Sequence, residues 1–442
     1  MLDINYIKRE PELFKKTIRD KGINLDLDEL LACYDDLVIL NKEINGLRER
    51  RNAIAKECGM LKEREVVGAD AEALNGARKA AGKAGLPLAE GKEVAMQLKA
   101  LERRQVDLED RYRRLLLLVP APVLPAVPVG NGDFDNVELY RRGELPQFDF
   151  QPLDHLAIVE GLGLVDFVGA RAAAGARAYA LLGDLMLLEM AVHRYAVDYL
   201  VGRGFQPVAP PVMVRQEAME GTGYFPLGLE NAYELKKDDL FLTGTCEVGL
   251  VAMHRNRLFE KQELPRRLVG LNTCFRREAG AAGKDTRGLF RVHQFQKVEQ
   301  VAFTVADQEA GLAMHYELLE NAEAILNALE LPYRVVQVCI GDIGQGQVFK
   351  HDIETYMPVR GGYFETHSCS FLADFQARRL NLRYEEGGRR PYVYTVNNTA
   401  AATPRLLIAL LENHQEKDGR VRIPGCLQPY MGGRTHLEAR RY

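Results

Sequence analysis

Two stretches of heptad-spaced residues constrain this chain more than any other feature. Between them, residues 68–91 are rich in glycine and alanine and contain one proline, so the chain can reverse there. The sequence therefore predicts an antiparallel helical hairpin with helices about 35–50 Å long. The positions that carry the pattern are Leu37, Leu40, Ile44, Leu47, Arg51, Ile54, Cys58 and Leu61 in the first helix, and Val94, Leu98, Leu101, Gln105, Leu108, Tyr112 and Leu115 in the second.

The predicted hairpin is basic, although the whole chain has a formal net charge of −4. Lysines and arginines outnumber acidic residues over residues 41–118, and they gather on the first helix, near the reversal and on the return helix. One interpretation is the ordinary solvated face of a coiled coil. The other is a rod that binds the phosphates of a nucleic acid. The residues alone leave both open.

A proline-rich stretch follows the hairpin and cannot continue a helix. We therefore place a domain boundary near residue 120, with an N-terminal domain over residues 1–118 and a second domain over residues 119–442. In the second domain, many strand-like runs with helix-like runs grouped between them predict an α+β fold. Such a fold is built on a mainly antiparallel sheet with helices packed around it. Its helix-like runs are 182–204, 307–329 and 403–416, and its strand-like runs are 205–214, 239–244, 266–275, 295–305, 333–341, 362–373 and 392–396.

Composition is that of a soluble globular protein, with 47% hydrophobic and 27% charged residues in a chain of 442. No apolar stretch approaches the roughly 18–20 residues of a membrane span, and the N-terminus lacks a signal-like apolar run. We expect a cytoplasmic protein without a membrane segment. The seven cysteines are scattered, without CxxC or zinc-site spacing, which predicts free thiols and no zinc.

Residues 275–299 hold the densest concentration of groups suited to chemistry. Two strands joined by a glycine-rich loop would place Arg276 and Glu278 on one face of the first strand. The second strand would place one more set on a shared face: Arg291, His293, Phe295, Lys297 and Glu299. An arginine can hold a phosphate, a phenyl ring can stack on a base, and a glutamate can accept a hydrogen bond from an amine. This pattern favours a nucleotide platform over an exposed polar hairpin.

Two glycine-rich segments do not match known nucleotide-binding loops. The loop "GAAGKDT" is not a P-loop, because Glu278 and Asp285 stand where that motif needs Gly and Ser or Thr. Residues 341–347 lack the glycine spacing of a dinucleotide fingerprint.

The segments "FRRE" (275–278), "GKDTRG" (283–288) and "RVHQF" (291–295) resemble motif 2 of class II aminoacyl-tRNA synthetases, most closely that of bacterial seryl-tRNA synthetases. Further segments follow in the order of that family: "GTGYFP" (221–226), "LTGTCEV" (242–248), "ETHSCS" (365–370), "DFQARRLNLRY" (374–384), "NNTAAATPR" (397–405) and "LLENHQEKDGRVRIPGCLQPYM" (410–431). The resemblance covers nearly the whole chain, and the helical hairpin stands where the family has its tRNA-binding arm.

The resemblance implies an ATP-dependent ligase that forms seryl-adenylate and transfers serine to tRNA(Ser), and by the same logic to tRNA(Sec). Arg276 and Arg405 would be the catalytic residues. Mg²⁺ would be bound with ATP at Glu365 and Ser368. The ATP-binding residues would be Arg276, Arg277, Glu278, Val292, Phe295, Glu365, Thr366, His367, Ser368 and Arg405.

The resemblance also implies the amino-acid pocket, the tRNA contacts and a homodimer. The helix at 182–203 and the strand at Pro210–Pro211 correspond to motif 1, the dimer interface of the family. L-serine would be bound by Thr245, Cys246, Glu247, Arg276, Glu299 and Thr399. The tRNA would be bound by Arg48, Arg51, Lys56, Arg78, Lys79 and Arg287.

Three alternatives are weighed against this interpretation. A synthetase-like enzyme that serves a carrier protein or a secondary metabolite often lacks the tRNA arm, which this chain keeps. A non-catalytic tRNA-binding paralogue would be free to lose Arg276, Glu278, Glu299 or Arg405, and all four are present. A threonyl enzyme or a zinc-type seryl enzyme needs Cys and His ligands that this sequence does not assemble.

Overall fold

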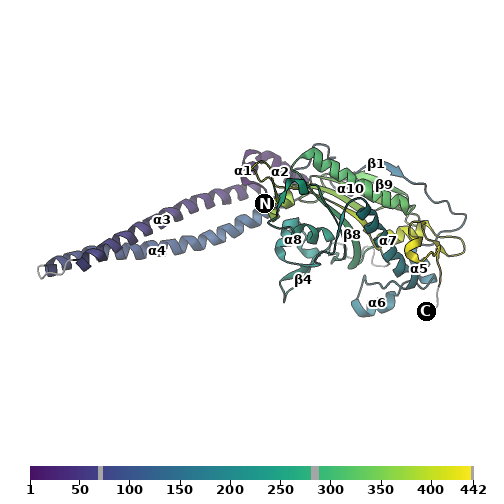
Figure 1. Cartoon of the computed structure of the whole chain (residues 1–442), viewed down its shortest axis with the longest axis horizontal. Coiled ribbons are helices and arrows are strands. Elements are labelled where there is room, and N and C mark those ends of the chain that lie inside the picture. The colour runs from purple at the N-terminus through teal and green to yellow at the C-terminus, as the bar shows by residue number, and fades with distance from the viewer. Residues whose placement is uncertain (68–72, 280–287, 440–442) are drawn as a thin grey trace. The chain divides into compact units, whose positions relative to one another are not determined.

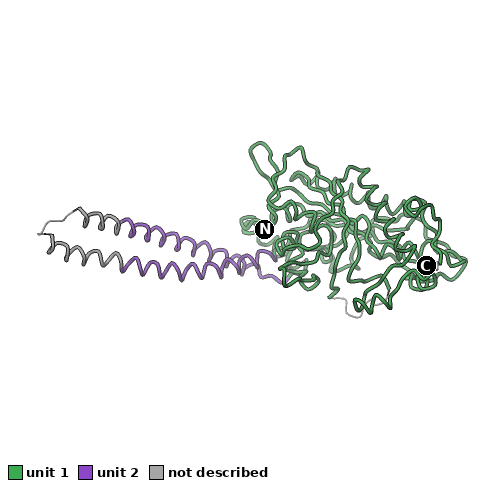
Figure 2. The backbone as a smooth tube through the Cα atoms, turned by 60° about the horizontal axis from the view of Figure 1, so that its bottom comes forward, with its two compact units in different colours: residues 1–23, 119–442 green, residues 24–118 purple. Residues whose placement is uncertain are grey.

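The computed structural model describes residues 1–67, 73–279 and 288–439, and it describes no side chains between residues 57 and 88. The chain divides into two compact units, one made of residues 1–23 and 119–442 and the other of residues 24–118 (Figure 2). The domain over residues 1–118 stays a prediction, because its first 23 residues group with the larger unit.

The smaller unit is the antiparallel pair of helices α3 (Leu27–Val67) and α4 (Ala73–Leu118), which confirms the hairpin (Figure 1). At 1.5 Å per residue the helices extend about 60 and 70 Å, beyond the predicted length. The reversal predicted across residues 68–91 is wrong for most of that segment, since α4 already begins at Ala73 and alanine is the strongest helix former. Along the seam, the buried apolar side chains are Leu40, Ile44, Ile54, Val94 and Leu98.

The larger unit is built on an eight-stranded sheet, within the described residues, in the order β1-β9-β10-β11-β13-β8-β7-β2. Its pairs are antiparallel except β2 with β7, so the predicted α+β fold is confirmed. One central strand, β10, had not been predicted. The strands are β1 (Val137–Arg142), β2 (Gln206–Val208), β7 (Arg266–Phe275), β8 (Gln294–Thr304), β9 (Tyr333–Gln337), β10 (Phe349–Met357), β11 (Gly362–Ala373) and β13 (Tyr394–Ala402).

Three helices, α7 (Gly183–Gly202), α10 (Gln308–Ala328) and α12 (Arg405–Asn413), enclose the main core against one face of this sheet. Burying each large apolar side chain in such a core stabilises the fold by about 1.5–3 kcal/mol. On the other face, α9 (Cys246–Ala252) and α11 (Phe375–Leu380) pack against Val301 and Phe303. The middle of that second face is polar and open, and the candidate site lies there.

None of the helices in the described residues is both long and apolar enough to cross a membrane. Short helices and strands connect the elements described above. They are α1 (Ile4–Arg9), α2 (Pro11–Asp20), α5 (His155–Gly161), α6 (Phe167–Ala174), α8 (Gln216–Thr222), β3 (Met213–Val214), β4 (Tyr233–Leu235), β5 (Leu240–Leu242), β6 (Leu258–Glu260), β12 (Arg383–Glu385), β14 (Val421–Arg422) and β15 (His436–Leu437).

Candidate active site

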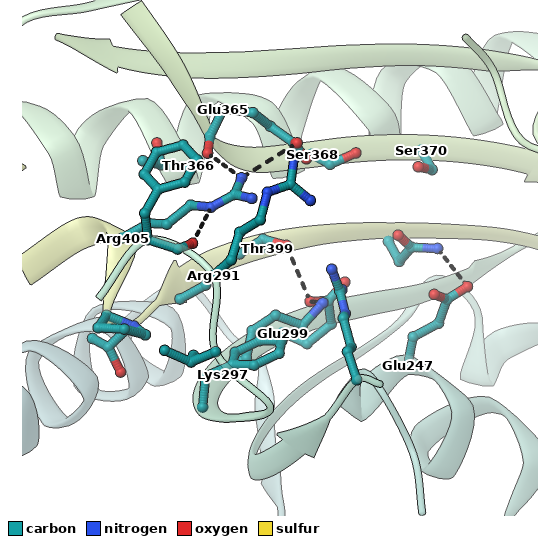
Figure 3. Close-up of a pocket in the computed structure, with 18 of the residues that line it drawn as sticks. Glu247, Arg291, Lys297, Glu299, Glu365, Thr366, Ser368, Ser370, Thr399 and Arg405 are labelled. Carbon is teal, nitrogen blue, oxygen red and sulfur yellow. Dashed lines mark hydrogen bonds and ion pairs between the residues drawn. The ribbon is translucent and has the colours of Figure 1, made fainter. Parts of the chain in front are cut away.

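A cleft of about 220 Å³ lies over the polar middle of the sheet (Figure 3). The adjacent strands β10, β11, β13 and β8 supply its floor, and α9 and the start of α12 supply its ends. Glu365 and Arg405 lie at one end of the view, Glu299 lies in the middle, and Glu247 lies at the other end. The cleft therefore has two chemically different ends, one with the guanidinium group of Arg405 and one with the carboxylate of Glu247.

The strand β11 carries a β-bulge at Thr366, because its pairing with β10 passes from His367 directly to Glu365. One extra residue changes which side chains face the sheet surface. As a result Glu365, Thr366 and Ser368 all line the cleft, although strict alternation would divide them between two faces.

A second bulge lies in β13 at Ala400, which has no partner in the pairing with β8. Beside it, Thr399 lies opposite Glu299 and Ala402 lies opposite Lys297. All four of these partners line the cleft. The two bulges thus bring polar groups of neighbouring strands to the same surface.

Arg405, the first residue of α12, is fixed at one end of the cleft by groups from two other segments. Its Nε donates to the carbonyl oxygen of Phe290 at 3.2 Å, and its Nη1 donates to the carbonyl oxygen of Glu365 at 2.9 Å. The guanidinium carbon also lies 4.6 Å from the centre of the Phe290 ring. Burial lowers the pKa of Arg405, which remains a cation because an arginine pKa lies far above neutral.

Glu365 has a side chain that is 51% exposed, with one carboxylate oxygen 3.6 Å from Arg405 Nη1. Desolvation raises its pKa, but the surrounding cations Lys350, Arg405, Arg276 and Lys297 together bring it below the ordinary value. The carboxylate is therefore ionised at neutral pH, and this end of the cleft is strongly positive around it.

A buried ion pair lies beside Glu365. Lys350 Nζ is 2.8 Å from Asp352 Oδ2, and both residues come from β10. Burial raises the pKa of Asp352 to about 6, while Lys350 opposes that rise. The Ser368 hydroxyl also hydrogen-bonds to this carboxylate. Oxygen atoms of Glu365, Ser368 and Asp352 thus gather at one end of the cleft.

At the opposite end, the buried carboxylate of Glu247 accepts three hydrogen bonds. They come from Tyr224 Oη at 2.8 Å, Gln376 Nε2 at 2.7 Å and Asn397 Nδ2 at 2.9 Å. Burial, and then the charge of Glu299, raise the pKa of Glu247 to about 7. A cation bound here would favour the ionised carboxylate.

Glu299 is the second buried carboxylate. It lies 2.5 Å from Lys297 Nζ and accepts a hydrogen bond from Thr399 Oγ1 at 3.4 Å. Burial raises the pKa of Glu299, and Lys297 opposes the rise. Two carboxylates, one hydroxyl and one cation therefore line the cleft from its middle to the Glu247 end.

Arg276 lies beside the wall that connects the two ends. Its Nε donates to the carbonyl oxygen of Gly244 at 3.2 Å, and its guanidinium carbon lies 5.1 Å from the centre of the Phe295 ring. Glu278 accepts a hydrogen bond from Arg291 at 3.3 Å. The buried Val292 completes this wall. One cavity thus holds an arginine that can bind a phosphate, an aromatic ring that can stack on a base, and a glutamate that can accept a hydrogen bond from an amine.

The predicted alternation over residues 289–293 is wrong. The ladder between β7 and β8 ends at Phe275 and Gln294, so the residues beyond it are free of strand geometry. Glu278 even has a positive φ of 52°. Arg291 reaches the cleft, whereas His293 lies outside it, with Nδ1 3.1 Å from the carbonyl oxygen of Arg276.

Four of the predicted ligand residues do not line the cleft. Thr245 Oγ1 accepts the backbone N–H of Glu247 at 3.2 Å as the N-cap of α9. Cys246 Sγ lies 3.4 Å from the carbonyl oxygen of Lys297. Arg277 is exposed, and His367 hydrogen-bonds to Thr366.

The predicted tRNA contacts lie elsewhere. Arg48, Arg51 and Lys56 belong to the smaller unit, and their side chains are exposed. Arg287 lies outside the described residues, and the side chains of Arg78 and Lys79 also lie outside the description.

Several lining residues were missing from the predicted site: Tyr224, Phe290, Arg291, Lys297, Gln347, Lys350, Ser370 and Asn397. A signal existed for Lys350, because the charged residues 350, 352 and 354 alternate with uncharged residues at 349, 351, 353 and 355, as in a strand with two different faces. Arg291 and Lys297 had been placed on the shared face of the second predicted strand, but neither had been assigned to bind a ligand.

Comparison with known proteins agrees with this arrangement. Residues 1–122 match the model of the seryl-tRNA synthetase N-terminal domain, and residues 231–414 match that of the class II tRNA synthetase core domain (G, H, P, S and T). The serine–tRNA ligase of Deinococcus radiodurans is 46% identical over 438 residues, covering 99% of each chain. That of Rubrobacter xylanophilus is 40% identical over the full length of both.

A solved structure is similar over its whole length. The crystal structure of seryl-tRNA synthetase from Pyrococcus horikoshii complexed with ATP has a TM-score of 0.85 and 37% identity, and the match covers 100% of both chains. Since family models, relatives and structure agree over both units, the chain belongs to the seryl-tRNA synthetase family of class II aminoacyl-tRNA synthetases.

Proposed function

We propose that this protein activates L-serine with ATP and transfers the seryl group to tRNA(Ser). One observation carries the proposal: a single cleft has two arginines from different segments, Arg276 and Arg405, and two buried carboxylates, Glu247 and Glu299. The arginines suit a triphosphate, and the carboxylates suit an amino acid that bears an ammonium and a hydroxyl group.

The amino-acid end explains a preference for serine. Glu247, whose pKa burial raises to about 7, would bind the ammonium group of the substrate. Glu299 and Thr399 would bind its hydroxyl group. Alanine would leave these buried polar groups unpaired, which costs about 1–3 kcal/mol for each group. Threonine would be rejected by size.

At the other end, Arg276 and Arg405 would neutralise the phosphates of ATP. Phe295 would stack on adenine, with the Val292 backbone beside it, and Glu278 would accept a hydrogen bond from the adenine amine. An oxygen of the serine carboxylate attacks the α-phosphorus, the bond to the bridging oxygen breaks, and pyrophosphate leaves. Positioning and charge neutralisation supply the catalysis, since no side-chain nucleophile is needed.

The donor set fits Mg²⁺. This cation prefers oxygen ligands and is usually held by one or two carboxylates together with substrate phosphates. Glu365 presents a half-exposed carboxylate, and Ser368 presents a hydroxyl on the same surface because of the bulge at Thr366. Glu365 and Ser368 would hold the ion, which supplies further charge neutralisation when it is bound with ATP.

The hairpin of the smaller unit would bind tRNA(Ser), and by the same logic tRNA(Sec), in the cytoplasm. Arg51 and Lys56 are exposed there. Arg48 lies 2.8 Å from Glu102 across the hairpin, so part of its charge stabilises the helix pair. Surface pairs of this kind are weak, about 0–1 kcal/mol, and a phosphate can compete for the arginine. Arg78, Lys79 and Arg287 remain candidates from the sequence alone.

A homodimer would cover the apolar face at α7. Leu182, Met186 and Met190 are 41%, 44% and 53% exposed, respectively. Exposed apolar clusters of this kind mark interfaces. The predicted motif 1 helix contributes this surface, which supports a second copy as the partner.

The alternative of a non-catalytic paralogue explains the cleft less well. Arg276, Glu278, Glu299 and Arg405 could vary freely in such a protein, and here all four line one cavity. A carrier-loading enzyme would share the cleft but would not need the basic hairpin.

Pyrophosphate exchange tests the proposal directly. We expect ATP–pyrophosphate exchange with serine, and much weaker exchange with threonine, alanine and glycine. Charging of total tRNA should then label serine-accepting species. An enzyme that exchanges with another of the four amino acids and ignores serine would overturn the assignment, and exchange without any charging of tRNA would favour the carrier-loading alternative.

A further inference from the structure

Residues 344–347 form a tight turn that reaches the cleft through one side chain. The Gln347 N–H donates to the carbonyl oxygen of Gly344 at 3.2 Å, and the Gly344 N–H donates to Gln347 Oε1 at 2.6 Å. Gln347 Nε2 in turn donates to Ser370 Oγ at 2.6 Å. Gln347 and Ser370 both line the cleft, so this turn forms part of its wall.

The wall that Gln347 forms belongs to the amino-acid end. Ser370 on β11 lies opposite Asn397 on β13, and Asn397 donates to Glu247 at 2.9 Å. A continuous polar row therefore connects Gln347 with the carboxylate proposed to bind the ammonium group of serine. Moving Gln347 would change the shape of this end while leaving the Arg405 end untouched.

Lys21 holds the turn from the side of the N-terminal segment. Its Nζ donates to the carbonyl oxygens of Gly344 at 3.0 Å, Gln345 at 3.2 Å and Gln347 at 2.8 Å. An ammonium group has three donors, and here all three are used by one turn. Burial lowers the pKa of Lys21 to about 7, and only its ammonium form has all three donors, so the full contact with the turn forms below that pKa.

The chain that follows the hairpin binds the same turn. The Ala121 N–H donates to the carbonyl oxygen of Gln345 at 3.0 Å, and the Leu124 N–H donates to the carbonyl oxygen of Val348 at 2.9 Å. Gly346 packs against Phe375 so closely that a Cβ there would lie 2.4 Å from the ring. The backbone of the turn thus has little freedom, and its position depends on what holds it.

We propose that Lys21 is a positioning residue for amino-acid recognition, which acts by holding Gln347 against Ser370 and so sets the end wall of the serine pocket. The proposal rests on the proposed function, in which this end of the cleft binds serine. It differs from a simple tether of the N-terminal segment, because a tether would affect stability without affecting how serine binds.

The test uses the full-length protein and serine-dependent pyrophosphate exchange. Four variants are compared, Lys21→Met, Lys21→Arg, Gln347→Ala and the double variant Lys21→Met/Gln347→Ala, with Lys16→Met as the matched control. Lys16 lies on α2, the helix that ends just before Lys21, is exposed and pairs with Asp20. The readouts are KM for serine, KM for ATP, the ratio of threonine to serine activation, and Tm.

We expect Lys21→Met and Gln347→Ala each to raise KM for serine about 5- to 30-fold, with KM for ATP within about twofold of the wild type. The double variant should be no worse than the poorer single one, because both changes remove the same wall. Lys21→Arg should restore part of the loss. Gln347→Ala should also raise the relative use of threonine.

Two results would overturn the proposal. If Lys21→Met lowers Tm but leaves KM for serine at the wild-type value, the lysine is a structural tether. If Lys21→Met does not fold, Gln347→Ala decides alone, and an unchanged KM for serine rejects the proposal. Wild-type protein that shows no exchange with serine would overturn the proposed function as well, which separates the two failures.

Discussion

Arg405 Nη1 donates to the backbone carbonyl oxygen of Glu365 at 2.9 Å, which ties the first residue of α12 to the bulged strand β11. Because Nε also binds the carbonyl oxygen of Phe290, the guanidinium plane is held from two directions. The arginine would therefore meet a phosphate of ATP in one fixed orientation.

Arg405→Lys should lower kcat/KM for pyrophosphate exchange about 100-fold or more. A lysine keeps the charge but cannot hold both carbonyl oxygens and a phosphate, since its ammonium is a single point donor. Steady-state exchange at varied ATP measures the loss. Activity close to that of the wild type would show that the charge alone suffices and that the orientation is unimportant.

Arg276→Ala should abolish serine-dependent exchange while the fold is retained. The side chain makes one hydrogen bond to Gly244 and one ring contact, so its removal leaves no large cavity in a core. Circular dichroism and Tm check the fold. Arg255→Ala, at an exposed position outside the cleft, serves as the control and should behave as the wild type.

The affinity for serine should rise with pH up to about 7 and then level off. Burial raises the pKa of Glu247 from 4.5 to about 7, and only its ionised form attracts an ammonium group. Below that pKa, binding must release a proton, so KM for serine should fall by at most about tenfold per pH unit as the pH increases. Exchange assays between about pH 5.5 and 8 measure this profile, with KM for ATP as the comparison.

The carboxylate of Glu247 should make the folded protein without substrate less stable as the pH rises, whereas the affinity for serine should increase. Between about pH 4.5 and 7 the folded protein without substrate binds more protons than the unfolded chain, so the contribution of Glu247 to stability falls as the pH rises through that window. Glu247→Gln should flatten both profiles and weaken serine binding. A flat KM profile in the wild type would mean that Glu247 does not bind the ammonium group.

Replacing residues 41–110 by a short Gly/Ser linker should spare serine activation and cripple tRNA charging. The hairpin forms a compact unit with its own apolar seam, whereas the cleft lies wholly in the other unit. Exchange and charging are measured on the same preparation. Charging that survives the deletion would favour the interpretation of the hairpin as an ordinary solvated coiled coil.

The elements that were predicted correctly carry their signal in short-range sequence patterns. The heptad seams predicted the hairpin because most residues at every third or fourth position are apolar, and β11 was predicted with its observed bounds. The strand β7 ends at Phe275, so the prediction that Arg276 and Glu278 lie on it is wrong. β10 was missed although Lys350, Asp352 and Glu354 alternate with uncharged residues. This alternation of charged and uncharged side chains is itself typical of a strand, so β10 could have been predicted from the sequence.

Other errors have a three-dimensional origin. Thr245 is a good ligand by residue type, but its hydroxyl caps α9 because the first N–H groups of a helix, buried here, need an acceptor. His293 and Arg291 were assigned to one face, yet the ladder ends at Gln294 and the alternation ends with it. The contacts of Lys21 with residues 344–347 join segments more than three hundred positions apart, and no local pattern encodes them.

The single extra residues at Thr366 and Ala400 divide each of their strands into two segments with opposite phase. On β13, a substitution or shift on the Asn397 side leaves the phase of the Ala402 side unchanged. The half of the floor proposed to bind the amino acid can therefore diverge in evolution while the half proposed to bind the triphosphate is preserved. A β-bulge thus allows the two segments of one strand to present independent sets of side chains to the cleft.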